Sequence, residues 1–332
     1  RRPMTPSTLF DLASLTKVVG TTTATMILFE EGRIELDAPV ARYLEEWRNR
    51  PDRAAITVRH LLSHSAGLPA GAPLYRLAPD RDSALTIVLN TPLQYEPGTA
   101  SIYSDFSMIL MAMVVERVAG MPLDRFLDQR VFRPLGMRDT GFRPRTWGPD
   151  TGLVRFPGGD PAILSRIAPT SIDTVHRKTH IHADVHDSNA FRLGGVAGHA
   201  GLFSSARDLA VFAQFLLNGG SYAGITLLQP ATVRAFTATQ NSYSSRALGW
   251  DTPSKESSSG DFASPSAFGH TGFTGTSIWI DPERDLFIIL LTNRVNPTSN
   301  NPKIFPLRRA IADAAQLGIT DLPPPPRRFG PV

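Results

Sequence analysis

Three short apolar segments near the C-terminus most limit the folds that this 332-residue chain can adopt. They are Phe268–Gly272, Thr276–Asp281 and Leu286–Asn293, and each has the length and composition of a β-strand. A Pro-containing turn sequence, Asp281–Arg284, lies between the last two segments. We therefore expect these two strands to form an antiparallel hairpin within a sheet at this end of the chain.

Other segments have the apolar spacing and end signals of helices. Ser14–Gly32 repeats apolar residues every three or four positions, and Gly32 stands where a helix would stop. The remaining expected helices are Thr57–Ser63 with Thr57 as N-cap, the buried helix Phe106–Val118, a helix from the capping sequence at Ser205 to about Leu217, and Lys303–Ala315. Residues 143–188 have few periodic apolar positions, so we expect a long irregular excursion there.

Composition excludes several classes of protein and of site. The chain has no cysteine, which rules out disulfides, thiolate catalysis and cysteine metal ligands. No apolar run is long enough to span a membrane, and a net charge of +4 is too small to indicate nucleic-acid binding. The chain begins with Arg, so the sequence leaves both a bacterial periplasmic and a cytoplasmic location open.

A candidate nucleophile lies at the start of the first expected helix. In Ser14-Leu15-Thr16-Lys17 the serine and the lysine are three positions apart, so both side chains would lie on one helix face. Serine needs a nearby base, and a desolvated lysine can act as one. Lys17 is one of only four lysines in the chain. The alternative is a helix start with Ser14 as cap and Lys17 in solvent.

Two further clusters carry side chains suited to the same chemistry. Tyr103-Ser104-Asp105 precedes the buried helix, and a tyrosine there could act as an acid or base. His270-Thr271-Gly272 lies in the first strand of the C-terminal sheet, where glycine lets a ligand approach the backbone. Each cluster also has an ordinary structural interpretation, as a helix entry or as a glycine-containing strand.

Taken in order, these three clusters resemble the motifs of the penicillin-recognising serine enzymes. The branch that holds class C β-lactamases, D-alanyl-D-alanine carboxypeptidases and family VIII carboxylesterases is the most similar, and the stretches Val58–Leu68 and Gly201–Ser205 also resemble it. The resemblance implies an α+β fold in which helices flank an antiparallel sheet beside a mostly helical region. It divides the chain into a sheet domain, 1–45 with 200–332, and a helical domain, 46–199.

The resemblance also implies a mechanism. Ser14 would form an acyl-enzyme, Lys17 and Tyr103 would share the base and acid roles, and the backbone N–H groups of Ser14 and Phe273 would form the oxyanion hole. Substrate would be bound by Asp105, His270, Thr271 and Gly272. No cofactor and no metal are needed, and the expected substrates are a small ester, a β-lactam or a peptidoglycan peptide.

Departures from the family pattern shape the choice among these substrates. Asp105 stands where asparagine is common, and a carboxylate there would favour charged Lys17. His270 stands where β-lactamases often carry lysine, and it would be largely neutral at pH 7. Both changes make the site less attractive to anions and favour carboxylesterase activity on simple esters. Arg192 or Arg294 could restore positive charge, so β-lactamase and D-alanyl-D-alanine carboxypeptidase activities remain alternatives.

The short segment before Ser14 raises a different hypothesis. The family usually places N-terminal strands in the sheet before the nucleophile, and only thirteen residues precede Ser14 here, so either the chain is truncated or its sheet is smaller than usual. A sheet without those strands would have an unpaired edge, which favours homodimer pairing. Together with Asp105, this is the support for a non-catalytic module that binds a cell-wall peptide or a partner protein.

Two other motifs have simpler interpretations. His176, His180, His182 and His186 include pairs with the spacing of helical metal ligands, but a polar loop accounts for them and no metal is expected. The glycine-rich stretch 194–201 lacks the strand-to-helix setting of a nucleotide site, so it is read as a turn beside the active site.

Overall fold

The predicted C-terminal sheet is present in the computed structural model, which describes residues 3–147 and 159–329. It consists of β8 (Phe268–Gly272), β9 (Thr276–Asp281) and β10 (Leu286–Leu290), in the order β10-β9-β8. Both pairings are antiparallel, with Leu286 opposite Asp281 across the hairpin and Phe268 opposite Ile280. The hairpin prediction is confirmed, although the last strand ends at Leu290 rather than at Asn293.

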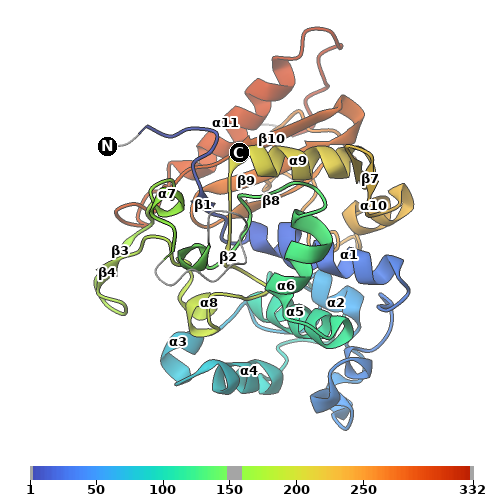
Figure 1. Ribbon diagram of the computed structural model, residues 1–332. Helices are drawn as coiled ribbons and strands as arrows, with labels where there is room; N and C mark the ends of the chain where they lie inside the picture. The colour runs from blue at the N-terminus through green and yellow to red at the C-terminus, as the bar shows by residue number, and fades with distance from the viewer. Residues whose placement is uncertain (1–2, 148–158, 330–332) are drawn as a thin grey trace.

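Two helices pack on this sheet (Figure 1). The helix α9 (Ala206–Leu217) contacts β9 and β10, and α11 (Ile304–Leu317) contacts β10. The Ser205 hydroxyl accepts a hydrogen bond from the Asp208 N–H, so Ser205 caps α9 as its sequence predicts. The expected arrangement of an antiparallel sheet flanked by helices is therefore observed.

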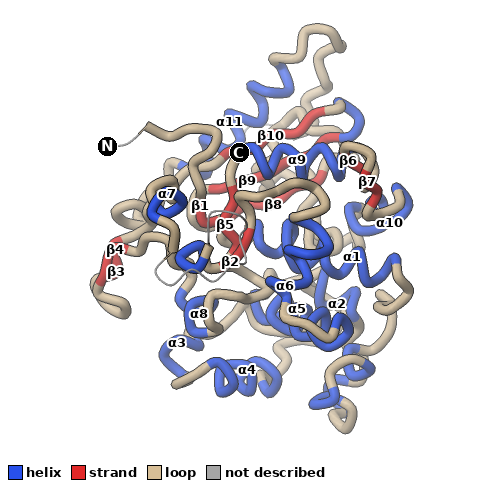
Figure 2. The backbone as a smooth tube through the Cα atoms, in the orientation of Figure 1, coloured by secondary structure: helices blue, strands red, loops and turns tan. Residues whose placement is uncertain are grey.

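A second small sheet brings distant parts of the chain together (Figure 2). It has the order β1-β5-β2 and joins β1 (Phe10–Asp11), directly before Ser14, to β5 (Leu202–Ser204) and β2 (Gly141–Phe142). Two strand pairs lie elsewhere, β3 (Ile172–Asp173) with β4 (Thr179–His180) and β6 (Ser221–Tyr222) with β7 (Ile225–Thr226). The pairing of β1 with β5 fixes the N-terminal segment against the glycine-rich turn.

The first helix starts later than its sequence indicates. A π-helical stretch over Lys17–Thr22 runs into α1 (Thr23–Glu30), and Gly32 at φ +68° follows its end as expected. Ser14 lies in the turn before this helix, because Ala13 adopts a left-handed backbone conformation with φ +46°. The nucleophile candidate is thus held on a bent segment rather than within regular helix.

The other helices cover the lower part of the molecule in Figure 1 or connect it to the sheets. Two confirm predictions closely: Thr57 and His60 form a reciprocal cap on α2 (Val58–Leu62), and α5 (Asp105–Ala119) ends at Gly120. The remaining α-helices are α3 (Leu74–Leu77), α4 (Arg81–Asn90), α6 (Leu123–Leu127), α7 (Pro161–Leu164), α8 (Ser188–Arg192) and α10 (Pro230–Thr237). Shorter 3-10 turns span Val40–Arg42, Glu45–Trp47, Pro51–Arg53, Pro144–Thr146 and Pro282–Arg284, and Asp128–Phe132 is a π-helical turn.

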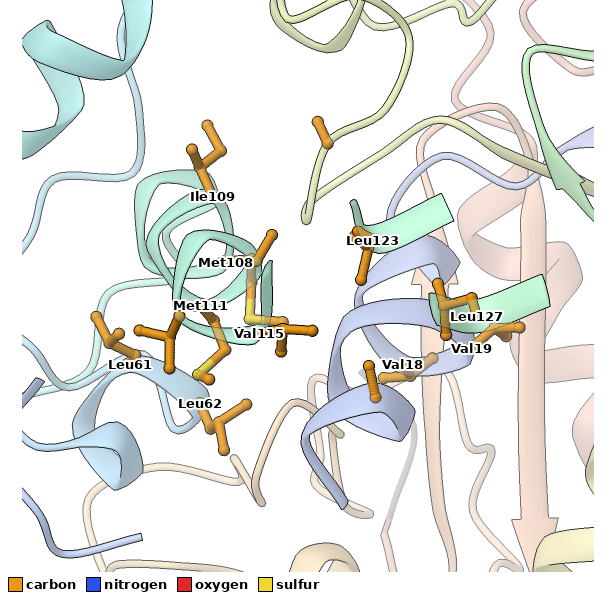
Figure 3. Close-up of a cluster of buried hydrophobic side chains, with 14 of the residues drawn as sticks. Val18, Val19, Leu61, Leu62, Met108, Ile109, Met111, Val115, Leu123 and Leu127 are labelled. Carbon is orange, nitrogen blue, oxygen red and sulfur yellow. The ribbon is translucent and has the colours of Figure 1, made fainter. Parts of the chain in front are cut away.

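The hydrophobic core is continuous across these helices (Figure 3). Side chains from the helical segment that follows Ser14, such as Val19, lie near Leu127 of α6, and Met111 of α5 lies near Leu62 of α2. The same cluster of buried side chains includes Phe212 of α9 and Ile278 of β9. One cluster therefore contains residues of both expected domains, and the division at 45/46 and 199/200 stays a prediction.

The expected irregular excursion at 143–188 contains only short elements where it is described. These are a 3-10 turn, α7 and the β3–β4 pair, and residues 148–158 lie outside the described part. Among the described helices, none is by itself long and apolar enough to cross a membrane; α5 and the segment Leu123–Phe132 meet that test only as a pair bent by 70°.

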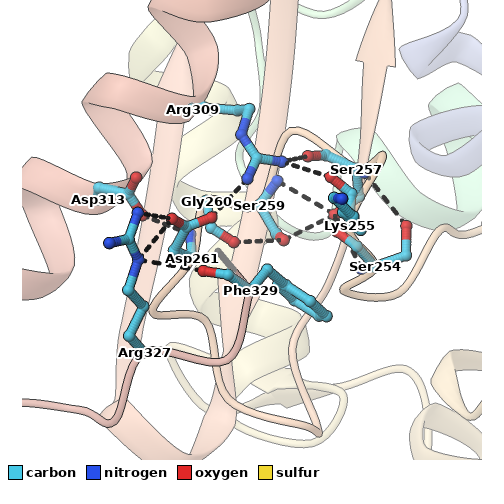
Figure 4. A network of polar contacts seen from close by, with 10 residues as sticks. All are labelled: Ser254, Lys255, Ser257, Ser259, Gly260, Asp261, Arg309, Asp313, Arg327 and Phe329. Carbon is cyan, nitrogen blue, oxygen red and sulfur yellow. Dashed lines mark hydrogen bonds and ion pairs between the residues drawn. The ribbon is translucent and has the colours of Figure 1, made fainter. Parts of the chain in front are cut away.

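The C-terminal tail is tied to the sheet side of the molecule by a polar network (Figure 4). The buried Asp261 carboxylate pairs with Arg309 of α11 at 2.5 Å and with Arg327 of the tail at 2.7 Å. Arg309 also donates to the carbonyl oxygens of Lys255 and Ser257. The serine-rich loop, α11 and the tail are thereby connected through one carboxylate.

Candidate active site

Ser14 is positioned by a buried carboxylate three residues earlier. Asp11 Oδ1 accepts the Ala13 N–H at 2.8 Å, and its Oδ2 accepts the His186 N–H at 2.6 Å. Burial raises the pKa of Asp11 to about 6, although both N–H groups lower it. The Asp11 carboxylate thus connects the turn at Ala13 to the backbone of the 182–187 segment. These two hydrogen bonds fix Ser14 in the turn just before the first helix.

Lys17 is completely buried directly behind Ser14. Its Nζ lies 3.0 Å from Ser14 Oγ, 3.2 Å from the His199 carbonyl oxygen and 2.7 Å from Asp105 Oδ1. An ammonium has three N–H donors, and these oxygens, with the Tyr103 side chain as a further hydrogen-bond partner, engage all of them. Burial lowers the pKa of Lys17, but the Asp105 carboxylate and Tyr103 outweigh it, so the pKa is raised. Lys17 is therefore a charged donor to Ser14 in this arrangement.

Tyr103 lies on the other side of the same ammonium. Its ring centroid is 4.7 Å from Lys17 Nζ, and it also contacts the rings of His64 at 4.7 Å and His270 at 5.7 Å. The loop is held because the Ser104 hydroxyl, which caps α5, donates to the Pro69 carbonyl oxygen. The sequence-predicted trio of Ser14, Lys17 and Tyr103 is thus brought together by the fold.

The β8 strand forms the opposite wall. Gly272 passes so close to the Ser14 turn that a Cβ atom there would lie 2.3 Å from the Leu12 carbonyl oxygen. The Thr276 hydroxyl donates to that same oxygen at 3.0 Å. Within 3–147 and 159–329, the backbone N–H groups of Ser14 and Phe273 have no acceptor, so both are available to an oxyanion.

His270 is a neutral part of this wall. Its Nδ1 lies 2.8 Å from the Thr271 carbonyl oxygen, and its Nε2 is buried with no partner in the described chain. Burial, followed by the charges of Arg246 and Lys17, lowers the pKa of His270 well below its usual range. This agrees with the sequence-based expectation of a mostly uncharged side chain at pH 7.

Two cavities meet at Ser14 and share Asp105, Asp187 and Phe273 in their walls. The larger has a volume of about 490 Å³ and is lined also by Tyr103, Arg246, Asp251, His270, Thr271, Gly272, Arg294, Phe305 and Arg308. The smaller has about 290 Å³ and is lined also by Ala13, Tyr75, His186, Ser188, Asn189, His199 and Ala200. All predicted site residues line the larger cavity except Lys17, which lies behind Ser14.

Several of these residues were not expected from the sequence. Arg246 lies 4.9 Å from the Tyr103 ring centroid, and Arg308 donates to the carbonyl oxygens of Gly272 and Thr276. No local pattern distinguishes these arginines from the others in the chain. Arg294, proposed as a source of positive charge, does line the cavity, whereas Arg192 binds the carbonyl oxygens of Pro79 and Tyr75 and does not.

His64 and Asp187 are further site residues with weak sequence signals. His64 is fully buried in the Val58–Leu68 stretch, and its Nδ1 accepts the Ser104 N–H at 3.1 Å. Asp187 caps α8 and lies 3.0 Å from His199 Nε2. A histidine beside Ser-Ala-Gly and an aspartate before a helix are common enough that neither could be singled out.

The four clustered histidines have separate partners. His176 packs on the Tyr75 ring, His180 lies 3.2 Å from Asn296, His182 contacts the Ile167 carbonyl oxygen and His186 stacks on Phe273. In the described ranges no group of three or more His, Asp or Glu side chains could hold a metal ion.

Known proteins are similar to this chain in sequence and in fold. A curated protein of Escherichia coli (strain K12), named "Putative D-alanyl-D-alanine carboxypeptidase", is 35% identical over 327 residues, which cover 91% of this chain and 73% of that protein. A penicillin-binding protein homolog from Caulobacter crescentus has a similar structure, with a TM-score of 0.71, 22% identity, and coverage of 93% of this chain and 84% of that one.

A second solved structure is also similar in fold to this chain. EstCE1, described as a hydrolase with promiscuous acyltransferase activity, matches with a TM-score of 0.68 and 23% identity over 94% of this chain and 86% of that one. These likenesses confirm the expected fold class. The family model described as Beta-lactamase matches residues 1–313. The chain therefore belongs to the β-lactamase family, the group that its three motifs resemble.

Proposed function

We propose that this protein is a serine acyl hydrolase that forms an acyl-enzyme on Ser14 through the Ser14-x-x-Lys17 pair. The observation that carries the proposal is the 3.0 Å hydrogen bond from Lys17 Nζ to Ser14 Oγ, at the point where two cavities meet. Membership of a family whose relatives are named as carboxypeptidase and hydrolase supports a hydrolytic reaction.

Tyr103 is the group that we assign as the base toward Ser14. Lys17 is a charged ammonium with all three donors engaged, so it holds the Ser14 oxygen but has no lone pair to accept a proton. Tyr103 lines the same cavity as Ser14 and lies against that ammonium, where its phenolic oxygen could take up and return a proton. Asp105 keeps Lys17 charged throughout.

The covalent steps then follow in a balanced sequence. Ser14 Oγ bonds to the substrate carbonyl carbon while Tyr103 takes the hydroxyl proton, and the N–H groups of Ser14 and Phe273 bind the oxyanion. The bond to the leaving group breaks as Tyr103 returns the proton to that group. Water adds to the acyl carbon in the second half, giving a carboxylic acid and restoring the Ser14 hydroxyl.

The larger cavity favours substrates whose leaving group carries a carboxylate. Arg246, Arg294 and Arg308 all line it, and in the described chain none of them makes an ion pair. The carboxylates of Asp187 and Asp251 line it as well, so within the described residues the three arginines outnumber the two carboxylates that have no lysine partner. Asp105, which as a lone charge would repel anions, is instead paired with Lys17. The charge argument for simple esters therefore loses weight, and a D-alanyl peptide or a β-lactam, each with a carboxylate, fits better. The name of the Escherichia coli relative supports the peptide.

Carboxylesterase activity is the second candidate. Phe273 and Phe305 line the same cavity, yet they are 54% and 60% exposed, and His270 beside them is uncharged. An apolar alkyl or aryl group could pack on these rings without any carboxylate. The two candidates share the Ser14 chemistry and differ only in what the larger cavity binds.

One set of turnover assays tests both candidates. Wild type, Ser14→Ala and the exposed control Ser242→Ala, which lies outside both cavities, are compared on diacetyl-Lys-D-Ala-D-Ala, nitrocefin and p-nitrophenyl butyrate. We expect turnover of a carboxylate-bearing substrate that disappears only in Ser14→Ala. Ser14-dependent turnover of the butyrate ester alone would favour the esterase. Turnover that survives in Ser14→Ala, or no turnover at all, would refute the proposal, and the latter result would favour a non-catalytic binding module.

A further inference from the structure

The smaller cavity lacks the arginines of the larger one, although both open onto Ser14. No lysine or arginine is among its lining residues, and the two carboxylates that line it, Asp105 and Asp187, also line the larger cavity. Asp105 is neutralised by the buried Lys17 at 2.7 Å. Asp187 has no such partner, since its only side-chain neighbour in an ion-pair geometry within the described residues is His199.

His199 occupies only one of the two carboxylate oxygens of Asp187. Its ring is 1% exposed, its Nε2 lies 3.0 Å from Asp187 Oδ1, and its Nδ1 is buried without a partner in the described chain. The contacts from His199 Nε2 and from the Ala190 N–H both fall on Oδ1, so Asp187 Oδ2 has no hydrogen-bond partner in the described chain.

Asp187 is anionic and open to the cavity. Burial raises its pKa, but His199 and the Ala190 N–H lower it by more, so the pKa lies below its usual range. Both of these contacts fall on Oδ1, and the side chain remains 35% exposed. Arg177, the cation behind this wall, donates to the carbonyl oxygens of Val185 and His186 and does not line the cavity.

The other lining groups are neutral and polar. Tyr75, Ser188 and Asn189 line the cavity beside Asp187, and burial lowers the pKa of His186, which keeps that ring uncharged. An aspartate oxygen surrounded by hydroxyl, amide and aromatic groups is an environment that binds an ammonium. The larger cavity shares Asp187 with the smaller one but adds three arginines, so it favours an ammonium less.

We propose that the smaller cavity is a subsite for an ammonium group, with Asp187 as its specificity determinant. Preferred substrates would carry an amine on the acyl side of the scissile bond and a carboxylate on the leaving-group side. This inference rests on the proposed function, because the assignment of the leaving group to the arginine-lined cavity determines which half of the substrate enters the smaller one.

Ampicillin and benzylpenicillin are a matched pair for the test, since both carry the carboxylate and ampicillin adds one amine to the acyl side chain. Acylation rates are followed by intact-protein mass spectrometry. We expect wild type to react about tenfold faster with ampicillin, the factor supplied by one charge-assisted hydrogen bond of moderate strength. The ratio should fall to near one in Asp187→Asn, which keeps an oxygen to cap α8.

Asp184→Asn is the matched control, because Asp184 lies in the same segment but pairs with Arg145 and does not line the cavity. It should retain the wild-type ratio. A wild-type ratio near one, or a ratio that survives in Asp187→Asn, would overturn the proposal.

Equilibrium binding separates this proposal from the catalytic one. The dissociation constants of both penicillins for Ser14→Ala are measured by calorimetry, which requires no acylation. Ampicillin should bind about tenfold more tightly than benzylpenicillin. Equal affinities, or no binding of either compound, would refute the ammonium subsite whatever the wild type does. Tighter ampicillin binding without acylation of wild type would refute only the role of Ser14.

Discussion

Replacing Asp105 with asparagine tests how the buried charge of Lys17 is maintained. The carboxylate lies 2.7 Å from Lys17 Nζ, and the lysine side chain is fully buried. Asparagine keeps an oxygen as acceptor but removes the negative charge. Loss of one partner of a buried pair costs roughly 3–5 kcal/mol, and with the acceptor retained we expect the lower end, about 3 kcal/mol of unfolding free energy at pH 7.

The way in which the stability difference between the variant and the wild type changes with pH is a more specific test than its size at pH 7. In the wild type the pKa of Lys17 is raised in the folded state. The contribution of charged Lys17 to the stability of the protein is therefore complete below the unfolded-state pKa of 10.5, and it is lost as the pH rises through the folded-state pKa. In Asp105→Asn burial dominates and puts the folded pKa of Lys17 below the unfolded one. The variant then gains stability relative to wild type as the pH rises toward 10.5, because its unfolded state binds more protons.

Urea unfolding at pH 7 and pH 10 measures both effects. Selective labelling of lysine with carbon-13 at the ε position adds a direct probe, since the chain has only four lysines and Lys17→Arg assigns the resonance. The Lys17 signal should titrate at lower pH in Asp105→Asn than in wild type. Asp37→Asn, which breaks an exposed pair with Arg59, is the control and should cost under about 1 kcal/mol.

Two results would refute this reasoning. A loss below about 1 kcal/mol at pH 7 would mean that the pair does not hold a buried charge. Identical titration of the Lys17 signal in both proteins would mean that Asp105 does not control its protonation, and the assignment of Tyr103 as base would then lose its support.

Three further predictions concern the core and the site. Burial raises the pKa of Asp208 to about 6, so the charge of this carboxylate costs about 3 kcal/mol of folding free energy at neutral pH. Asp208→Asn should therefore raise the melting temperature at pH 7.5, and this gain should disappear near pH 4. A gain that does not depend on pH would contradict this prediction. In Gly272→Ala the new Cβ would lie 2.1 Å from Thr276 Oγ1 and 2.3 Å from the Leu12 carbonyl oxygen. Because these clashes would displace the Ser14 turn, we expect roughly a 100-fold loss of acylation rate. An unchanged rate would show that this contact does not position Ser14. Phe212→Ala empties a fully buried position and should cost about 3–5 kcal/mol in urea unfolding, whereas a cost under about 1 kcal/mol would show that the core collapses around it.

Local patterns were sufficient to predict much of the fold. The turn at Asp281–Arg284 and the flanking apolar runs gave the hairpin, and Thr57 and Ser205 marked the starts of α2 and α9. These features depend on residues within a few positions of one another. The start of the first helix could not be placed, because the left-handed conformation of Ala13 is stabilised by Asp11, which in turn binds the distant His186 N–H.

The candidate site, like the fold, was predictable where it depends on local motifs and not where it depends on tertiary packing. The sequence motifs predicted Ser14, Lys17 and Tyr103 as site residues, and the fold brings these three side chains together. The motifs could not show that Lys17 also donates to the His199 carbonyl oxygen, 182 positions away, since only tertiary packing creates that contact. For the same reason the cavity position of Arg246 was not predictable, whereas the effect of Asp105 on the charge of Lys17 was expected from the motifs themselves.

The central claim, an acyl-enzyme on Ser14, is tested most directly by covalent labelling. Wild type and Ser14→Ala are treated with a fluorophosphonate, and the labelled peptide is located by mass spectrometry, with urea-unfolded protein as a control for non-specific reaction. Our account predicts a single label on the peptide that contains Ser14 in folded wild type and no label in Ser14→Ala. A label on another residue, or labelling that persists in Ser14→Ala, would contradict it.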